Sequence, residues 1–411
     1  MWGNRSNKWK TSKSDSAPSA MPSAQPISYN HDGLASGKSV PSVNRVYEVL
    51  PISSVPPQPF NGSLNQIEFE LPKYLGKVIE CVLQFEVNLS SASTGTVQLL
   101  PTTGWCSRIE ILYNAAIVES VEPYDVHTET VAYSTDQELN LIAPSINLNP
   151  NGNLASAISV STTAQTRRFY LPLWANFFAS CQPFCKGFND SWRIRLTFAN
   201  SIVAASTGSV NAIGLTTLKL YATEANVSDG ADAGLGAAHQ SGITYHSVIR
   251  NKFTKSEPSI PNSSQYNQVM TTFTTDSAGL LVYVKPDSAD PATFLTTYAL
   301  DSLELRDSAN SQLTITLPAE LVEAYIMPYA TPINSSVSLN SNYNIYLFPF
   351  CNNVLNVLET GANTGGLALS GQERVLFTPV ANLSTAKVNV VSYEYAKMYV
   401  RGGNAKVVRQ A

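Results

Sequence analysis

The sequence predicts an all-β protein of two tandem β-sandwiches, with short helices in the loops. Three observations indicate this fold. The 411 residues exceed the roughly 250–300 residues at which a single core stops growing, so two domains are expected. Only 14% of the residues are charged, against about 25% in a typical domain, and Ser, Thr and Asn are abundant instead. Apolar and polar residues also alternate along many short segments, as they do in half-buried strands.

The first expected strands lie between residues 66 and 118. Apolar residues alternate with polar ones over 66–71 and again over 79–87. A period of two places one set of side chains in a core and the other set towards solvent or a partner. Segment 107–113 predicts a further strand, and 117–118 a return strand after a turn.

The rest of the first half contains a helix and three more strand segments. Residues 123–138 are the best candidate for a short helix. Segment 168–174 is strongly apolar, 192–198 alternates, and 218–222 ends the half. These patterns predict the remaining strands of the first sandwich.

Composition divides the chain into four parts. Residues 1–45 hold few large apolar side chains, so they cannot offset the entropy of ordering, and we predict a disordered basic N-terminal arm there. We place the first sandwich at 46–225. Residues 226–242 have the Gly, Ala, Asp and Ser content of a linker. The second sandwich, with a short C-terminal tail, is placed at 243–411.

The second half repeats the pattern of the first in the same order, about 170–195 residues further along the chain. The clearest repeated segments are 107–112 with 301–306, 168–174 with 344–350, 193–200 with 373–382, and 217–224 with 387–394. In the first of these pairs Glu110 and Glu304 occupy equivalent places. Repeats in register order indicate two homologous sandwiches.

Each half matches an eight-stranded jelly roll. About eight strand candidates fall in about 170 residues, joined by long loops rich in Ser, Asn and Thr. An immunoglobulin-type sandwich has about 100 residues and often a Cys–Trp–Cys core spacing. Neither feature fits this sequence. The fold class predicted is therefore all-β, with two tandem eight-stranded jelly rolls.

The sequence resembles a known family, the double jelly-roll major capsid proteins. That group includes the capsid proteins of tailless membrane-containing bacteriophages, virophages and polinton-like viruses and, more distantly, adenovirus hexon. The resemblance lies chiefly in segments 168–174, 192–200 and 392–395, and in the Arg-Ile-Glu-Ile stretch after Ser107 with the helix-like segment that follows it. It covers most of residues 50–400 and depends on order and pattern rather than on an invariant motif.

The resemblance implies a viral major capsid protein that is not an enzyme and needs no cofactor. Family members form trimers whose six jelly rolls give a pseudo-hexagonal outline. The trimers pack into an icosahedral shell around the genome, often over an internal membrane. The implied partners are therefore other copies of the chain in a homotrimer and shell, minor capsid and penton proteins, and membrane lipid or genome. The implied location is the virion capsid.

Two groups of residues are candidates for contacts. In family members the N-terminal arm commonly lies on the inner face of the shell, and the basic start of this chain matches that role in charge. We expect contact with neighbours, membrane or genome through Arg5, Lys8, Trp9, Lys10 and Lys13. The alternative is a frayed terminus without such a role. Arg167 and Arg168, expected on a strand, are predicted to meet an acid across a subunit boundary.

No pattern predicts a catalytic or metal site. His127 lies between Asp125 and Glu129, but a spacing of two does not place side chains on one helix face, so a solvated helix or loop is expected. Cys181 and Cys185 form a single CxxxC pair, whereas a zinc site needs four ligands. Four acids in Gly, Ala and Ser-rich loops could bind calcium, but we expect solvated turns there. These acids are Asp229, Asp232, Asp287 and Asp290.

Other functions remain open. A carbohydrate-binding sandwich would need exposed aromatic side chains. Trp105, beside Gly104, is the exposed candidate, whereas Trp174 and Trp192 are expected in a core. A viral spike or receptor-binding protein would usually be longer and carry fibrous repeats. A sandwich glycosidase with two carboxylates is the enzymatic alternative.

Charge and apolar content bear on location. The net charge of −4 gives no overall basic field for nucleic acid. No apolar run reaches the roughly 18 residues of a membrane helix, and residues 1–20 lack the apolar core of a signal peptide. Five dispersed cysteines do not predict a disulfide framework. We expect the chain to fold in the host cytoplasm.

Overall fold

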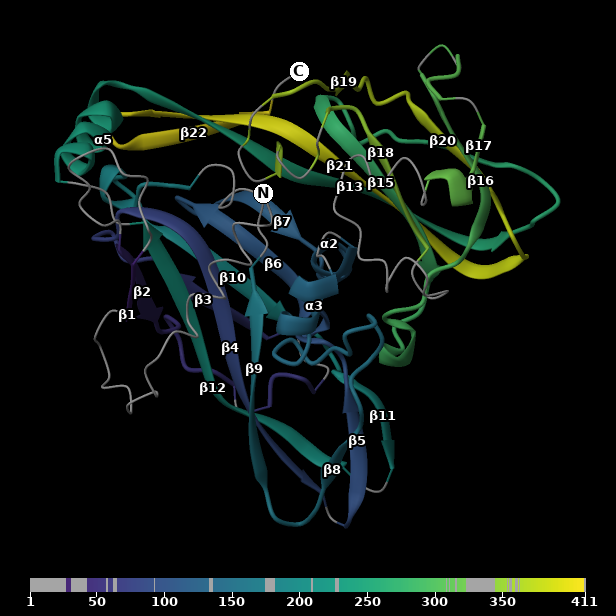
Figure 1. Ribbon diagram of the computed structural model, residues 1–411, viewed down its shortest axis with the longest axis horizontal. Helices are drawn as coiled ribbons and strands as arrows, with labels where there is room; N and C mark the ends of the chain where they lie inside the picture. Colours follow the sequence, from purple (N-terminus) through teal and green to yellow (C-terminus); the bar gives the residue numbers. More distant parts are fainter. Residues whose placement is uncertain are drawn as a thin grey trace.

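The computed structural model describes most of the chain, and Figure 1 shows its course. The described residues are 27–30, 43–56, 58–61, 65–91, 93–132, 136–173, 182–207, 210–225, 229–307, 309, 311–314, 316–322, 344–352, 354, 357–358, 361 and 363–409. Strands dominate them, and every strand pair is antiparallel, as predicted for an all-β protein.

The first sandwich consists of two main sheets. One has the strand order β1-β2-β12-β4-β9 and the other the order β3-β10-β6-β7. The strands are β1 (Ile27–Asn30), β2 (Val43–Val49), β3 (Gln66–Glu70), β4 (Lys77–Ser91), β6 (Cys106–Tyr113), β7 (Ala116–Val121), β9 (Gln165–Pro172), β10 (Trp192–Phe198) and β12 (Val210–Ala225). The alternation predicted for 66–71 is present in β3, where Ile67 and Phe69 are buried and their neighbours are not.

A small third sheet projects from the first sandwich. It has the order β11-β5-β8, with β5 at Gly95–Leu99, β8 at Ile158–Val160 and β11 at Val203–Thr207. Figure 1 shows this sheet at the lower end of the molecule, away from the second sandwich. The predicted helix at 123–138 is present as two helices, α2 (Pro123–Ala132) and α3 (Asp136–Ile142).

The second sandwich also has two sheets. One has the order β13-β21-β15-β18, with β19 and β22 paired at its margins, and the other the order β14-β20-β16-β17. The strands are β13 (Ile243–Ile260), β14 (Tyr266–Val269), β15 (Asp276–Pro286), β16 (Leu300–Arg306), β17 (Leu317–Pro318), β18 (Ile345–Pro349), β19 (Leu367–Ala368), β20 (Arg374–Pro379), β21 (Leu383–Arg401) and β22 (Asn404–Arg409). A short helix, α6 (Ala319–Leu321), follows Pro318.

The strand orders confirm the predicted repeat. The order β2-β12-β4-β9 corresponds to β13-β21-β15-β18, and β3-β10-β6-β7 corresponds to β14-β20-β16-β17. The repeated segments of the sequence occupy matching positions in these sheets: β6 with β16, β9 with β18, β10 with β20, and β12 with β21. Glu110 and Glu304 are both buried on these matching strands, and each pairs with arginine.

Trp105 corrects one prediction from the sequence. It was expected to be exposed beside Gly104, but its side chain is 0% exposed. Residues 102–104 form a short 3₁₀ turn, η2, that leads directly into β6 and directs the indole into the core. There its Nε1 donates a hydrogen bond to the carbonyl oxygen of Leu100 at 2.8 Å. Trp192 is buried, as predicted, and Trp174 lies outside the described residues.

The segment between the sandwiches is more regular than its composition suggested. Residues Asp229–Ser241 form the helix α5, and 226–228 lie outside the described residues. The Gly content indicated a linker, but the four alanines of the segment favour helix strongly. Residues 27–30 lie within the arm that was predicted to be disordered. They form the strand β1, which pairs with β2, so the prediction was wrong for these residues.

Candidate functional site: the junction of the two sandwiches

A buried polar network joins the two sandwiches. Acidic side chains from β7 and α2, with Glu122 between them, meet basic and phenolic side chains from β13 and β15 of the second sandwich. We call the following residues the inter-sandwich network: Glu119, Glu122, Asp125, Glu129, Arg250, Lys252 and Tyr283.

Arg250 connects β13 to two elements of the first sandwich. Its Nε donates to Oε1 of Glu129 at 2.6 Å, and its Nη2 donates to the other oxygen of the same carboxylate. Its Nη1 donates to Oε1 of Glu119 at 3.0 Å. All three side chains are at most 5% exposed. Because a bidentate pair constrains the plane of the guanidinium, it holds β13 in one orientation relative to α2.

Lys252 makes the second connection, two residues after Arg250 on β13. Its Nζ donates to Oε2 of Glu122 at 2.6 Å and to both carboxylate oxygens of Asp125 at 3.1 Å. The hydroxyl of Tyr283 on β15 donates to Oδ1 of Asp125 at 2.6 Å. Asp125 therefore contacts two strands of the second sandwich, which links α2 to the interior of their sheet.

The electrostatics keep these pairs charged. Burial disfavours a charged Arg250, but the charge and hydrogen bonds of Glu129, with the charge of Glu119, raise the pKa of Arg250 above its ordinary value. Burial likewise opposes charge on Lys252, and the carboxylates of Asp125 and Glu122 raise the pKa of that lysine. Each buried charge thus has a counter-charge, without which it would destabilise the fold by several kcal/mol.

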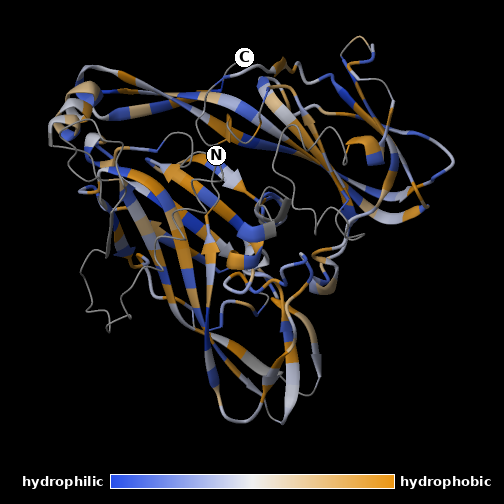
Figure 2. Cartoon of the chain, viewed as in Figure 1, coloured by the Kyte–Doolittle hydropathy of each residue, from blue (hydrophilic) through white to orange (hydrophobic). Residues whose placement is uncertain are grey.

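Apolar side chains complete the junction. Met398 and Val400 at the end of β21 belong to the core of the first sandwich, and Tyr124 of α2 belongs to that of the second. Phe294, just after the short turn η4 (Pro291–Thr293), packs against both cores. In the Figure 1 view β13 and β21 run along the first sandwich, and Figure 2 shows hydrophobic residues on them there. The two sandwiches therefore share buried apolar surface as well as ion pairs.

Helix α5 and the β21–β22 turn form a further contact. His239 of α5 lies within 3.1 Å of the hydroxyl of Tyr245 on β13, through Nε2. A Cβ atom at Gly187, in the turn η3 (Cys185–Gly187) of the first sandwich, would clash with the His239 ring. The side chain of Asn189 donates to the carbonyl oxygen of Gly402 at 2.8 Å. The segment between the sandwiches is thus docked on the first one.

The acids of the inter-sandwich network are occupied by cations of the same chain. Within the described ranges, no group of three or more His, Cys, Asp or Glu residues could hold a metal ion. Nor is any helix of the described part long and apolar enough to span a bilayer.

Comparisons with known proteins agree on the architecture. No protein-family model matches the chain, and no curated protein matches it in sequence. Solved structures do match. A chain of the PBCV-1 virus capsid gives a TM-score of 0.66 at 11% identity, covering 92% of this chain and 99% of that chain. The Faustovirus major capsid protein gives 0.63 at 10% identity, covering 90% and 93%. A chain of the Sputnik virophage gives 0.60 at 11% identity, covering 97% and 95%.

The chain has the double jelly-roll fold. The matches extend over nearly the full length of both chains, so they include the junction as well as each sandwich. At 10–11% identity, this similarity establishes the fold.

Of the two groups of residues predicted to make contacts, only the arginine pair lies in the described part of the fold. Arg5, Lys8, Trp9, Lys10 and Lys13 lie outside the described residues. Arg167 and Arg168 lie on the edge strand β9, and both are exposed. The Nε of Arg168 donates to Oε2 of Glu86 on the neighbouring strand β4 at 2.7 Å. This acid belongs to the same chain, and a contact across a subunit boundary stays a prediction for both arginines.

His127 was expected on a solvated surface, and that expectation was wrong. The side chain is fully buried in α2, where Nδ1 lies 3.0 Å from Oγ1 of Thr103 and the ring contacts Tyr124 and Phe294. Phe294 comes from the other sandwich, so local sequence could not reveal this burial. Burial, assisted by the positive charge of Lys285, lowers the pKa of His127 to about 3.

Acidification should therefore destabilise the protein through His127. Its pKa is about 6.5 when unfolded and about 3 when folded, so between these values the unfolded chain binds more protons. The stabilisation is complete above the unfolded pKa and is lost as the pH falls, by up to about 1.4 kcal/mol per pH unit. Urea denaturation between about pH 7 and pH 5 should show a smaller loss in His127→Gln than in the wild type. Equal losses would contradict this role.

Two of the remaining candidates, Asp232 and Asp290, have side-chain partners within the fold. Cys185 is buried in η3, and burial raises its thiol pKa to about 12, while Cys181 lies outside the described residues. Asp232 pairs with Lys186 at 3.1 Å. Asp290 caps η4, its Oδ1 accepting from the backbone N–H of Ala292 at 2.9 Å. These contacts give Asp232 and Asp290 roles within the fold.

Proposed function

We propose that this protein is a viral major capsid protein that forms homotrimers of pseudo-hexagonal outline, which then assemble into an icosahedral shell around the genome. One observation carries the proposal: two sandwiches whose main strands follow matching orders are held together at one relative orientation by the inter-sandwich network. Two equivalent units per chain provide two corners of a hexagon, so three chains provide six.

Further features support an assembly function. The solved structures of similar fold are viral capsid proteins, named as such in PBCV-1 and Faustovirus. A chain with only 14% charged residues has surfaces that can be buried against other copies without stranding many charges. Closed symmetric assembly is the usual result of such self-complementary surfaces. The carbohydrate-binding alternative loses its expected platform, because Trp105 is part of a core.

The finer parts of the proposal concern partners and location. We place the protein in the virion capsid after folding in the host cytoplasm, with no catalytic role. Minor capsid and penton proteins would adjoin its shell. The basic arm would lie inside, where Arg5, Lys8, Trp9, Lys10 and Lys13 would meet neighbours, membrane or genome. Arg167 and Arg168, exposed on β9, would contribute to contacts between chains.

Light scattering combined with negative-stain electron microscopy tests the proposal. We expect a particle of three times 44.4 kDa with a hexagonal outline, or closed shells. A clean monomer over the whole accessible concentration range, in the buffers that preserve its fold, would overturn the proposal.

Removal of the arm should separate trimer formation from shell assembly. A chain lacking residues 2–40 loses the edge strand β1 but keeps all other strands of both sandwiches and the complete inter-sandwich network, so it should form soluble trimers. Because it lacks the basic contacts proposed for the inner face, its yield of closed shells should fall at least about tenfold. A tenfold change corresponds to about 1.4 kcal/mol, which is the contribution of a few exposed ion pairs. Particle counts by electron microscopy measure this yield. Normal shells from the shortened chain would refute the role of the arm.

A further inference from the structure

One sheet face outside the junction has an unusual charge. Beyond the second sandwich, the ends of β13, β21 and β22 form a three-stranded sheet whose inner side packs on the first sandwich through Met398 and Val400. Alternate residues point the other way. We call this outer side the basic face: Thr244, His246, Lys397, Tyr399, Arg401, Lys406 and Val408.

The strand register places these side chains together. Thr244 pairs with Tyr399, which pairs with Lys406, while His246 pairs with Lys397, which pairs with Val408. Directly paired residues of antiparallel strands project on the same side, with Cβ atoms about 5 Å apart. Lys397 and Arg401 are four residues apart on one strand, or about 13 Å at a rise of about 3.3 Å per residue. The three cations therefore occupy a compact area.

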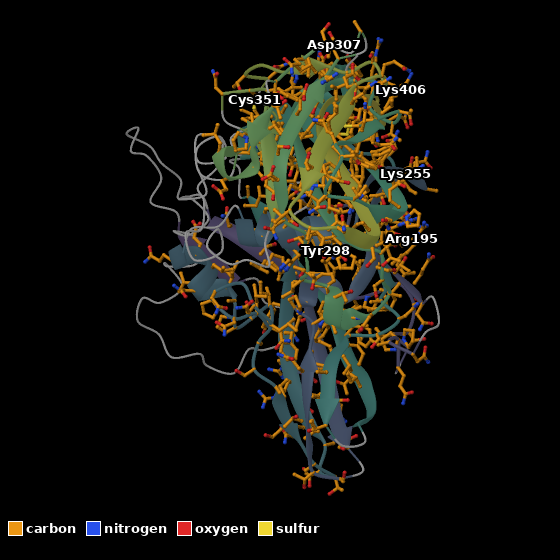
Figure 3. The ribbon with its side chains drawn as sticks, turned by 90° about the vertical axis from the view of Figure 1, so that its right-hand side faces the viewer. Arg195, Lys255, Tyr298, Asp307, Cys351 and Lys406 are labelled. Atoms are coloured by element: carbon orange, nitrogen blue, oxygen red, sulfur yellow. The ribbon has the colours of Figure 1, made fainter. Side chains whose placement is uncertain are left out.

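These cations have no acidic neighbours on the face. The segments 243–247, 396–401 and 404–409 contain no Asp or Glu. Among the described residues, no salt bridge involves Lys397, Arg401 or Lys406, although most arginines on the sheets of the first sandwich are paired with glutamates. Figure 3 shows Lys406 at the margin of the molecule. In a chain of net charge −4, such a face is complementary to an anionic surface.

The apolar residues on the face distinguish between possible anionic partners. Tyr399 is 48% exposed and Val408 is 39% exposed, and both alternate with the cations. Nucleic acid phosphates would contact the cations but leave Val408 in water. A phospholipid bilayer contacts both kinds of group, because headgroup phosphates attract Lys and Arg while Tyr and small apolar side chains enter the interface. The gently twisted sheet also presents these groups to a broad, flat partner.

We propose that the basic face binds the surface of an anionic phospholipid bilayer. The inference rests on the proposed function only for its setting, a membrane lying beneath the shell. Figure 1 places β22 and the small sheet β5–β8–β11 at opposite ends of the molecule, so a shell in which that sheet points outwards turns the basic face inwards. Binding by each chain is weak, and an assembled shell multiplies it.

Co-sedimentation with vesicles tests this site on the full-length protein. The vesicles contain phosphatidylcholine alone, or phosphatidylcholine and phosphatidylserine in equal amounts. The variant Lys397→Gln/Arg401→Gln/Lys406→Gln should bind the anionic vesicles roughly 100-fold more weakly than the wild type, as expected for the loss of three surface cations. The matched control Arg108→Gln/Arg193→Gln/Lys255→Gln removes the same charge from other exposed strand positions and should bind within about threefold of the wild type.

Further variants separate lipid binding from folding and assembly. The charge-preserving variant Lys397→Arg/Lys406→Arg should bind like the wild type. Tyr399→Ala should weaken binding to anionic vesicles while leaving the salt dependence unchanged. Electron microscopy of the triple variant should show normal trimers, so a failed lipid site is distinguishable from a failed capsid proposal. The inference is overturned if wild type and triple variant sediment equally, if neither binds, or if the substitutions weaken binding to duplex DNA instead of vesicles.

Discussion

Replacing Arg250 with alanine should lower the free energy of unfolding by about 3–5 kcal/mol, because it leaves two buried carboxylates without a counter-charge. Glu119 and Glu129 are at most 5% exposed and both accept hydrogen bonds from Arg250. Both carboxylates are buried from bulk water in the folded protein, Glu119 on β7 and Glu129 on α2. We therefore expect the variant both to unfold earlier and to lose the docking of the second sandwich on the first.

Arg193→Ala is the matched control for this substitution. Arg193 also pairs with two glutamates, Glu68 at 3.6 Å and Glu70 at 3.2 Å, but its side chain is 44% exposed. Exposed pairs contribute about 0–1 kcal/mol, so this control should change stability little. Guanidinium denaturation followed by tryptophan fluorescence measures both variants. Equal effects of the two substitutions would show that the inter-sandwich network does not stabilise the junction.

A compensating variant separates the unpaired charge from the lost packing. In Arg250→Met/Glu119→Gln/Glu129→Gln the buried charges are removed together and the side chains keep similar volumes. Buried ion pairs can often be replaced in this way at little cost. We expect this variant to recover most of the stability lost in Arg250→Ala. Continued instability would mean that the bidentate geometry, more than charge balance, holds the sandwiches together.

The second large effect should come from Trp105→Ala, which is expected to cost about 3–5 kcal/mol. The Trp105 ring packs at 5.2 Å from both Phe85 and Phe169, between centroids, and at 5.8 Å from Phe60. Alanine would leave a cavity among these rings and free the carbonyl oxygen of Leu100 that Nε1 occupies. Thermal denaturation in the same buffer measures the loss.

Trp105→Phe provides the control for this cavity. It keeps most of the ring volume and removes only the hydrogen bond and part of the packing, so the loss should be about half or less of that in Trp105→Ala. If stability is unchanged in both variants, Trp105 is not part of the core, and the carbohydrate-binding alternative is open again.

Much of the double jelly-roll fold could be predicted from the sequence because strand periodicity is a local signal. The alternation in 66–71 and 192–198 predicts β3 and β10, whereas the pairing of these two strands is decided by the tertiary structure. The repeat of 107–112 at 301–306 predicts two like sandwiches. Composition was misleading for α5, whose glycines suggested a linker. This segment forms a helix that docks on the first sandwich, which local composition does not reveal.

The junction could have been foreseen only in part. Residues 109–166 contain seven acids and no Lys or Arg, whereas 233–256 contain three Lys or Arg and no acid. This imbalance indicates that the two segments attract each other. It does not select the partners: that Arg250 meets Glu119 and Glu129, while Lys252 meets Glu122 and Asp125, depends on the register of β13 against α2.

By itself, the sequence determined the class and the repeat of this protein, because alternation, turn residues and similar segments act over a few neighbouring positions. Only the tertiary structure decided that His127 and Trp105 are buried, that the ends of β13 and β21 cover the first sandwich, and that Lys397, Arg401 and Lys406 share one exposed face. The physical reason is that burial and charge pairing depend on partners brought from far along the chain, whose positions only the packing of the two sandwiches specifies.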